Sequence, residues 1–575
     1  MKTRPDSPSP WLTPFPRQFV DKGLNVSKWT DLEPYFQMLE DHPLDTVDEL
    51  EAWLLKWSEL KEVVDEFCTK RYIEMTCHTD DDKKSQDYLY CVREVEPEAT
   101  AWEDRLNRKY LASSALDDLD KGKYGQLTRM IKEGVELFDE KNIPLQVELS
   151  ELSQEYQKIM GAMTVHFEGE EKTLPQMSAY LLGVDRKKRK SAYVAIVERR
   201  KKEEESLENI FDNMLGLRAR WADNLGLPDY REYCFRSKLR DYTPDDCYEF
   251  HNAIEKAAVP LARELAEKRK MELGLEKLAP WDTSCDAKGL GPLKPFEKPD
   301  DLFTGVHNIF SSVDSRLGDM FGAIRFSMDL ESRKGKAPGG YQATLAEARI
   351  PFIFTNAVGT HDDVNTLLHE GGHAFHTLKC RDLPLVWYHH ASMEFAEVAS
   401  MSMELVGGER LEPFYEKEEE RKRAMRQRME WIVNLFLWVA QVDAFQHWIY
   451  TNPGHTGKER VNAWVELSGR FNAGVDWSLA PAGSLEYSWH RQLHIFELPF
   501  YYIEYAIAQL GALQIYRKYK EDKSKAIEDY LNALSLGGSR IPKDLFSAAN
   551  IRFDFSEELL RGLMDFVKHE ISELS

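Results

Sequence analysis

Cysteine pairs, a secretory leader and long apolar runs are all missing from this sequence. The seven cysteines are scattered and form no Cys-x-x-Cys pair, which argues against a disulfide framework and against a zinc site built from thiolates. The N-terminus, Met1 to Trp11, is polar and proline-rich and lacks the apolar centre of a signal peptide. No run of about 18 uncharged apolar residues occurs, so we predict no transmembrane helix. Together these absences predict a protein of a reducing compartment, the cytoplasm.

Positive charge is also scarce. Lys and Arg number 75 against 98 Asp and Glu, which gives a formal net charge of −23 at pH 7. Such a surface repels nucleic-acid phosphates and anionic lipids, so we expect neither nucleic acid nor a membrane as a partner. The one basic stretch, Arg186 to Lys202, is followed by three glutamates. We interpret it as a solvated helix face.

Helical periodicity dominates a chain whose 575 residues and 42% apolar content allow a large core. The clearest amphipathic helix runs from Leu50 to Val64, with apolar residues three and four apart. Similar patterns cover Tyr124 to Phe138, Leu145 to Met160, Ser206 to Asn224 and Tyr248 to Leu273. Strand signals are few: a weak one at Cys91 to Val95, and a better one at Gln342 to Thr355. Pro280 to Asp300 is the most loop-like region. We predict a mostly α fold with one small sheet near the middle.

The most informative segment lies between Thr366 and His376 and contains a His-Glu-Gly-Gly-His run. Residues four apart share a helix face, so His369 and His373 can hold one metal ion through their imidazole nitrogens. Glu370 can then reach a water on that metal without displacing it, as in His-Glu-x-x-His peptidases. The alternative is an ordinary amphipathic helix with surface histidines. The two glycines between the histidines disfavour this alternative, because each weakens a helix by about 1 kcal/mol relative to Ala.

A catalytic zinc usually takes a third protein ligand, and an apolar helix downstream offers three glutamates. These are Glu394, Glu397 and Glu404, and each is costly to bury unless it is paired or bound to metal. Glu397 and Glu404 are seven residues apart and therefore share a helix face. Spacing alone does not choose among the three. His389 and His390 are further candidates, but a loop position makes them less favoured.

The sequence resembles the M3 family of metallopeptidases, in its oligoendopeptidase F branch. The matching stretches keep the family's order and are Gly339-Gly340-Tyr341, Pro351-Phe352-Ile353, Asn356, the run from His369 to His376, Phe395-Ala-Glu397-x-x-Ser400 and Pro499 to Tyr505. The resemblance implies that Glu397 is the third zinc ligand and that the chain binds one Zn²⁺. It makes Glu394 and Glu404 candidates for orienting the two histidines.

The resemblance also implies a mostly helical fold with two lobes around a deep substrate channel. Residues 1–200 would form part of the channel wall, and residues 201–575 would form the catalytic region. The zinc would lie at the floor of the channel, near the small sheet. Such a channel admits short unstructured peptides and excludes folded proteins. We therefore expect short peptides as partners and a chain that is a monomer or a small homo-oligomer.

The family's catalytic tyrosines and histidine come from the C-terminal segment, which here is His490 to Tyr505. His494 matches the histidine best, and Tyr502 and Tyr505 are the candidates for stabilising the oxyanion. Tyr501 is a candidate for contacting the substrate. The alternative is that these aromatic side chains are simply part of the core.

Gly339, Gly340 and Tyr341 are the other predicted substrate contacts. The strand that follows them could pair with an extended peptide and leave the choice of side chains broad. The alternative is a plain hairpin that packs under the zinc helix.

We predict a zinc-dependent endopeptidase that hydrolyses short oligopeptides by attack of metal-activated water, with Glu370 as the general base. Two alternatives stay open. One is a zinc exopeptidase of the carboxypeptidase or dipeptidyl carboxypeptidase type, which would need a fixed cation such as Arg349, Arg491 or Lys336 for the substrate carboxylate. The other is a non-catalytic helical scaffold whose histidines bind no metal.

Overall fold

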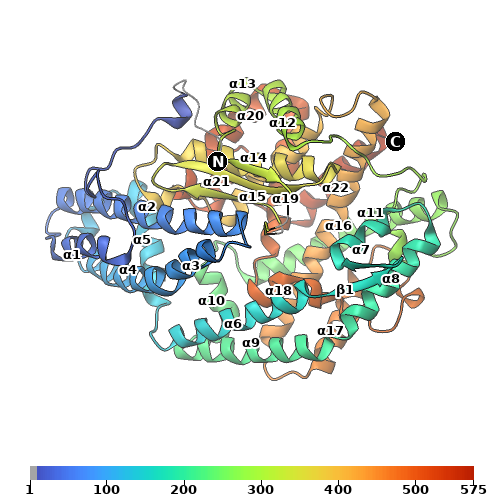
Figure 1. The fold of residues 1–575 in the computed structure, drawn as a ribbon, viewed down its shortest axis with the longest axis horizontal. Coiled ribbons are helices and arrows are strands. Elements are labelled where there is room, and N and C mark those ends of the chain that lie inside the picture. The colour runs from blue at the N-terminus through green and yellow to red at the C-terminus, as the bar shows by residue number, and fades with distance from the viewer. Residues whose placement is uncertain (1–8, 334, 338, 575) are drawn as a thin grey trace. The chain divides into compact units, whose positions relative to one another are not determined.

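The computed structural model describes residues 9–333, 335–337 and 339–574. Helices dominate it, and the few strands form two small sheets (Figure 1), so the predicted mostly α fold is confirmed. The chain divides into two compact units. Unit 1 comprises Met1–Glu136, Lys294–Arg421 and Gly511–Phe553, and unit 2 comprises Leu137–Leu293, Lys422–Leu510 and Asp554–Ser575. Because the chain passes repeatedly from one unit to the other, these units do not coincide with the predicted regions 1–200 and 201–575.

Unit 1 begins with a layer of helices whose core is rich in tryptophan. The helices are α1 (Glu33–Asp41), α2 (Val47–Cys77), α3 (Asp82–Tyr90), α4 (Glu96–Leu111) and α5 (Lys121–Glu136). α2 starts at a capping box in which Thr46 and Glu49 satisfy each other's backbone N–H groups. Trp53 and Trp57 on its apolar stripe are buried, and their rings are 4.9 Å apart. The predicted helix at Leu50 to Val64 is therefore part of a longer one.

The prediction of a strand at Cys91 to Val95 is wrong. This segment is helical and joins α3 to α4. Its two buried side chains, Cys91 and Val95, are four residues apart, a spacing that gives one buried face in a helix or in a strand, so the sequence pattern did not separate the two.

The rest of unit 1 is a three-stranded sheet surrounded by helices. Its elements are α12 (Pro299–Val313), α13 (Ser315–Ala323), β3 (Met328–Glu331), β4 (Tyr341–Leu345), β5 (Ile350–Ala357), α14 (His361–Cys380), α15 (Met393–Gly408), α20 (Lys523–Leu534) and α21 (Pro542–Ala548). The strand order is β3-β5-β4, with β3 parallel and β4 antiparallel to the buried central strand β5. The predicted strand from Gln342 to Thr355 is thus a hairpin, interrupted where Arg349 takes a φ of 51°.

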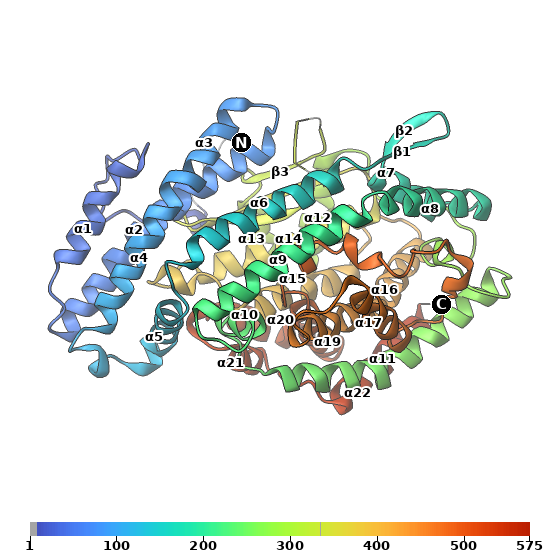
Figure 2. The same cartoon turned by 90° about the horizontal axis from the view of Figure 1, so that it is seen from below.

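Unit 2 is built mainly from long helices. Its elements are α6 (Asn142–Gly161), β1 (Thr164–Phe167), β2 (Glu170–Thr173), α7 (Leu174–Ser178), α8 (Arg186–Lys201), α9 (Glu204–Asn224), α10 (Tyr230–Ser237), α11 (Pro244–Glu272), α17 (Gly457–Arg470), α18 (Leu493–Glu497) and α22 (Glu557–Glu573). Most of α16 (Glu418–Thr451) also belongs to it, and α19 (Ile503–Glu521) is divided between the units. Figure 2 shows α6 beside α9 and α11 beside α22.

The basic stretch forms α8, but it is not only a solvated face. Arg189 is buried, and its Nη2 lies 3.0 Å from Oδ1 of the fully buried Asp282. Arg186 binds the same carboxylate at 2.8 Å. The two arginines therefore compensate an interior charge that would otherwise be costly. Within the described part of the chain, no helix has the length and apolar character needed to cross a bilayer.

Candidate active site

The His-Glu-Gly-Gly-His run lies in the middle of α14, which packs under the sheet of unit 1 (Figure 1). Thr360 caps the helix, and Asp363 completes a capping box. His369 and His373 project from one face, and their ring centroids are 4.8 Å apart. The Nε2 atoms of both rings face Oε2 of Glu397 on α15, at 3.4 Å and 3.9 Å. The structure therefore brings together the three residues that the sequence and the resemblance proposed as metal ligands.

Two further residues hold this group in place. Glu404 Oε1 lies 2.7 Å from His369 Nδ1, so the other ring nitrogen, Nε2, is left for a metal. The Ser400 hydroxyl donates to the Glu397 carboxylate at 3.2 Å and to the Glu397 carbonyl at 3.0 Å. This contact gives a physical role to the serine of the Phe-x-Glu-x-x-Ser element. Glu394, the third glutamate, is also buried.

The two glycines of the run allow close packing around the site. A Cβ on Gly372 would lie 2.5 Å from the carbonyl oxygen of Ala399 and from Cα of Ser400, both in the backbone of α15. A Cβ on Gly371 would lie 2.7 Å from the ring of Phe310 on α12. Because no side chain separates α14 from α15, Glu397 can reach the two histidines. The glycines thus serve the close packing of α14 against its neighbours.

Charge and burial set the electrostatics of the site. Burial alone would lower the pKa of His369, but the hydrogen bond and charge of Glu404, together with Glu397, raise it to about 9. Burial raises the pKa of Glu370 to about 7, against the opposing charge of His369. Burial holds the pKa of His373 well below its ordinary value. A divalent metal needs a neutral imidazole as ligand and negative charge nearby. His373 provides the first, and the carboxylates around His369 provide the second.

The residues present fit a zinc ion. Two imidazole nitrogens and one carboxylate oxygen lie within 4.8 Å of one another, which is the donor set of many catalytic zinc sites. Glu370 Oε2 is buried and has no hydrogen-bond partner among the described residues. Glu370 therefore has a carboxylate oxygen without a described partner beside the donor set, where a general base would accept a proton from water.

The predicted substrate contacts of unit 1 lie beside this group. A Cβ on Gly340 would lie 3.9 Å from Oε1 of Glu370, so the residue just before β4 lies beside the proposed base. β4 is an edge strand of its sheet. The Tyr341 hydroxyl is held by Thr76 of α2 at 2.6 Å, and its ring stacks on Phe354 at 4.7 Å, so Tyr341 is anchored in the wall of the site.

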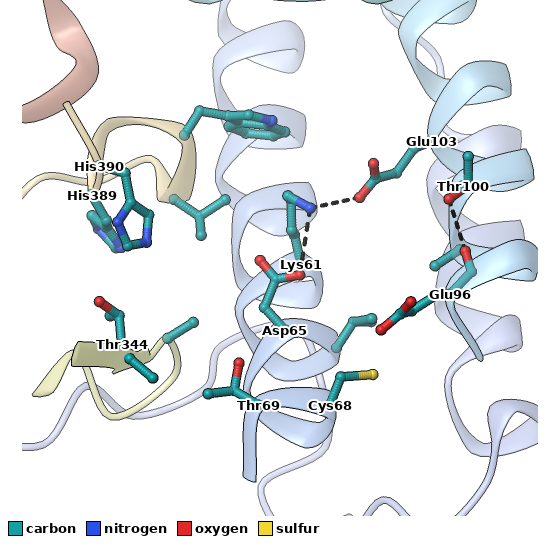
Figure 3. A pocket seen from close by; sticks show the side chains of 16 residues that line it. Lys61, Asp65, Cys68, Thr69, Glu96, Thr100, Glu103, Thr344, His389 and His390 are labelled. Carbon is teal, nitrogen blue, oxygen red and sulfur yellow. Dashed lines mark hydrogen bonds and ion pairs between the residues drawn. The ribbon is translucent and has the colours of Figure 1, made fainter. Parts of the chain in front are cut away.

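A cavity of about 630 Å³ opens at β4, among side chains from α2, α4 and the loop after α14. Figure 3 shows Lys61 between Asp65 and Glu103, at 3.5 Å and 2.7 Å, with Thr344 and His389 on the opposite side. Sequence reasoning missed this cavity. Its walls come from segments that are almost 300 residues apart, and no local pattern marks residues such as Lys61 as neighbours of β4.

The C-terminal candidates form a cluster of their own in unit 2. The ring of His494 lies 5.5, 5.0 and 5.8 Å from those of Tyr501, Tyr502 and Tyr505. His494 Nδ1 lies 2.8 Å from Nε2 of Gln492, and burial lowers the pKa of His494 to about 4. All four rings are only partly buried. They are therefore not simply core residues, and their catalytic roles stay a prediction.

Two of the three cations considered for an exopeptidase are already engaged. Lys336 Nζ is fully buried and donates to Asp329 Oδ1 at 2.9 Å and to the Thr355 carbonyl at 2.6 Å. Arg349 lies 2.8 Å from Glu62 and donates to the Arg381 carbonyl at 2.8 Å. Both side chains thus serve the fold. Arg491 lies over the ring of Trp438, 4.9 Å from its centroid.

The fold and this group of residues define a metallopeptidase of a known family. A model of peptidase family M3 matches residues 180–565, and a model of the M3 N-terminal domain matches residues 21–138. The chain therefore belongs to peptidase family M3, as the resemblance predicted.

Relatives named oligoendopeptidase F support this result. The chain is 24% identical over 338 residues to the plasmid oligoendopeptidase F of Lactococcus lactis subsp. cremoris, a match that covers 58% of this chain and 55% of that protein. It is 23% identical over 459 residues to the oligoendopeptidase F homolog of Borreliella burgdorferi, covering 74% and 73%. The chain thus spans about half the length of the Lactococcus protein.

Solved structures share the fold over nearly the whole chain. The structure of PZ peptidase A with an inhibitor superposes with a TM-score of 0.88 at 26% identity, over 97% of this chain and 99% of that one. A putative oligoendopeptidase F from Bacillus anthracis superposes with a TM-score of 0.84 at 24% identity, over 97% and 98%.

Proposed function

We propose that this chain is a zinc-dependent endopeptidase that hydrolyses short, unstructured oligopeptides. The observation that carries the proposal is the convergence of His369 Nε2 and His373 Nε2 on the carboxylate of Glu397, with the unpaired carboxylate of Glu370 beside them. Peptide cleavage is also the activity in the names of the relatives. Zinc, when bound, would supply a Lewis acid that polarises the scissile carbonyl and acidifies water.

Each residue of the group then has a defined task. His369, His373 and Glu397 would hold one Zn²⁺ per chain, and Glu404 would keep His369 in the tautomer that exposes Nε2. Glu370 would take the proton of the attacking water at its carboxylate and pass it to the leaving amine. A pKa raised by burial to about 7 suits a group that must first accept and then release a proton.

The edge strand β4 supports an extended binding mode for the peptide. Gly340, the residue just before this strand, lies beside Glu370, and the outer edge of β4 pairs with no strand among the described residues. A peptide paired along it would reach Thr344, at the cavity of Figure 3, about 13 Å from Gly340 at about 3.3 Å per residue. The cavity carries Asp65, Glu96 and Glu103 against one ammonium group, so an acidic side chain would be disfavoured there.

Internally quenched peptides with both ends blocked separate endopeptidase from exopeptidase action. We expect cleavage inside such peptides, with the bond identified by mass spectrometry. Cleavage only after the ends are unblocked would favour the exopeptidase, although Lys336 and Arg349 are tied to other groups. A purified chain that holds no zinc at His369 and His373 would favour the scaffold.

Metal analysis tests the choice of the third ligand. Glu397→Ala should lose zinc affinity at this site, whereas Glu394→Ala should keep it. If Glu397→Ala binds zinc like the wild type, and Glu394→Ala or Glu404→Ala does not, the assignment of Glu397 is wrong.

We also propose a reducing compartment, the cytoplasm, as the location. All seven cysteines are unpaired, and six of them are buried. Reduced, buried thiols are typical of proteins kept under reducing conditions.

A further inference from the structure

A second group of metal-ligating side chains lies inside unit 2, between α11 and α16. Cys247 and His251 are four residues apart on α11, and Asp443 and His447 are four residues apart on α16. Each pair therefore shares one helix face, with the spacing that His369 and His373 use in unit 1. The proposed peptidase function uses none of these four residues.

The ligating atoms of this group converge. One atom from each of Cys247, Asp443 and His447 lies within 4.8 Å of the other two, which also describes the group of the candidate active site. His447 Nε2 lies 3.3 Å from Asp443 Oδ2, close to the 3.4 Å between His369 and Glu397. Ligand atoms around a tetrahedral zinc stand about 3.4 Å apart, so small side-chain rotations would close the group on an ion. His251 Nε2 contacts Asp443 Oδ2 at 2.8 Å and completes the set.

Burying these four polar side chains costs free energy unless their polar atoms bind a hydrogen-bond partner or a metal. All four residues are 0–1% exposed. Among the described residues, Asp443 Oδ1 and His251 Nδ1 have no hydrogen-bond partner, and His447 Nε2 has an ion-pair contact with Asp443 Oδ2 at 3.3 Å but no hydrogen bond. The rings of Phe500 and Tyr248 lie 5.1 Å and 4.9 Å from that of His447, so the walls are largely apolar. Several unsatisfied polar atoms in one dry place indicate an ion or water that belongs there.

We propose that Cys247, Asp443 and His447 hold a second zinc ion, with His251 as fourth ligand or as the group that orients Asp443. A thiolate, an imidazole and a carboxylate together suit zinc among the common divalent ions. Cys247 lies in the first turns of α11, which begins at Pro244. Burial and the nearby charge of Asp443 raise the pKa of its thiol well above the ordinary value, so zinc would have to displace the thiol proton when it binds. A site with four protein donors and no access is structural, not catalytic.

One contact would change when the ion binds. Arg231 Nη1 lies 3.4 Å from His447 Nδ1, at the limit of a hydrogen bond. A metal on Nε2 would leave the ring proton on Nδ1, where it would face the guanidinium. Arg231 would then turn toward Asp229, which its Nη2 already approaches at 3.6 Å. The contact between Arg231 and His447 is long and weak, so its loss would cost little free energy and does not argue against metal binding.

Counting zinc in the full chain, produced with added Zn²⁺ and without chelator, tests the proposal. We expect two zinc ions per chain for the wild type, one for the His369→Ala/His373→Ala double variant, and one for Cys247→Ser. Cys234→Ser removes another buried thiol of unit 2 and should keep both ions. A single zinc in the wild type, lost in the double variant, would overturn the proposal in favour of ordered water.

Cobalt binding distinguishes the second site from the first by its absorption spectrum. Co²⁺ bound to a thiolate gives a near-ultraviolet charge-transfer absorption, and the group at His369 contains no sulfur. The absorption should appear in the wild type and in the His369→Ala/His373→Ala variant, and disappear in Cys247→Ser but not in Cys234→Ser. If it is absent from the wild type, the proposal fails even where Cys247→Ser does not fold. Peptidase activity enters neither measurement, so the outcome is independent of the proposed function.

Discussion

The group at His369 in unit 1 and the group at Cys247 in unit 2 use the same helical spacing in opposite surroundings. The side chains of His369 and His373 are 22% and 19% exposed, and an unpaired carboxylate, Glu370, stands beside them. The side chains of His251 and Asp443 are 1% and 0% exposed, among aromatic rings. The comparison teaches that spacing selects a possible metal site, whereas access and a neighbouring base decide whether the site can do chemistry.

Replacing the base should have the largest effect. Glu370→Gln should lower peptide turnover about 10³-fold, because an amide cannot accept the proton of water, while zinc stays bound. The assay is hydrolysis of a quenched peptide, combined with metal analysis of the same sample. Asp443→Asn provides the contrast: it should weaken the second zinc and leave turnover near that of the wild type. A Glu370→Gln enzyme with wild-type turnover would break the distinction between the two groups.

Adding a side chain at the contact between α14 and α15 should have the second-largest effect. Gly372→Ala would place a Cβ 2.5 Å from the backbone of α15, which we expect to destabilise unit 1 by about 3 kcal/mol and to weaken zinc binding at His369. Thermal unfolding and zinc titration measure the two effects. Gly125→Ala on α5 is the control, since nothing lies within 4 Å of its Cβ, and it should stabilise the chain by up to about 1 kcal/mol. Equal effects of the two substitutions would show that close packing is not what the glycine provides.

The charge group of Asp329 on β3, with Arg333 and Lys336, should respond to pH. Burial alone would raise the pKa of Asp329, but hydrogen bonds from Arg333 and Lys336 outweigh burial and lower it well below its ordinary value. The stability from this carboxylate is therefore present above the unfolded-state pKa of about 3.9 and is lost as pH falls through the folded-state value. Asp329→Asn should cost about 2 kcal/mol at pH 7.

The pH dependence of this stability difference tests whether the charge of Asp329 is the cause. The difference between the wild type and Asp329→Asn should shrink steadily below about pH 4, as followed by thermal unfolding across a pH series. A difference that is constant from pH 7 to pH 3 would mean that the charge of Asp329 contributes nothing.

The smallest effect should come from the residue that orients His369. Glu404→Gln keeps the shape of the side chain but loses the carboxylate that lies 2.7 Å from Nδ1, and we expect zinc affinity to fall about tenfold. Competition with a chromophoric chelator measures it. Glu412→Gln, at an exposed position, should leave the affinity unchanged. An unaltered affinity in Glu404→Gln would show that packing alone sets the orientation of His369.

The sequence predicted most helices because their apolar residues recur every three to four positions, as in α2 and α9. It failed at Cys91 to Val95, where a five-residue run fits either period and the neighbouring helices decide. In the site, spacing identified His369, Glu370 and His373. It did not choose Glu397 over Glu394 and Glu404, since that choice depends on which carboxylate α15 turns toward α14.

By itself, the sequence determined the mostly helical fold and the pair of histidines with its neighbouring glutamate, because these features are encoded within single helices, and it indicated the family through short motifs in a fixed order along the chain. The family resemblance pointed to Glu397, whereas spacing alone did not choose among the glutamates. Only the tertiary structure showed that Glu397 faces the histidines, that Gly372 serves the contact between two helices, and that a cavity opens beside β4. It also brought Cys247 to Asp443 and His447. No local motif marks that group, because its halves are almost 200 residues apart and meet only when α11 packs against α16.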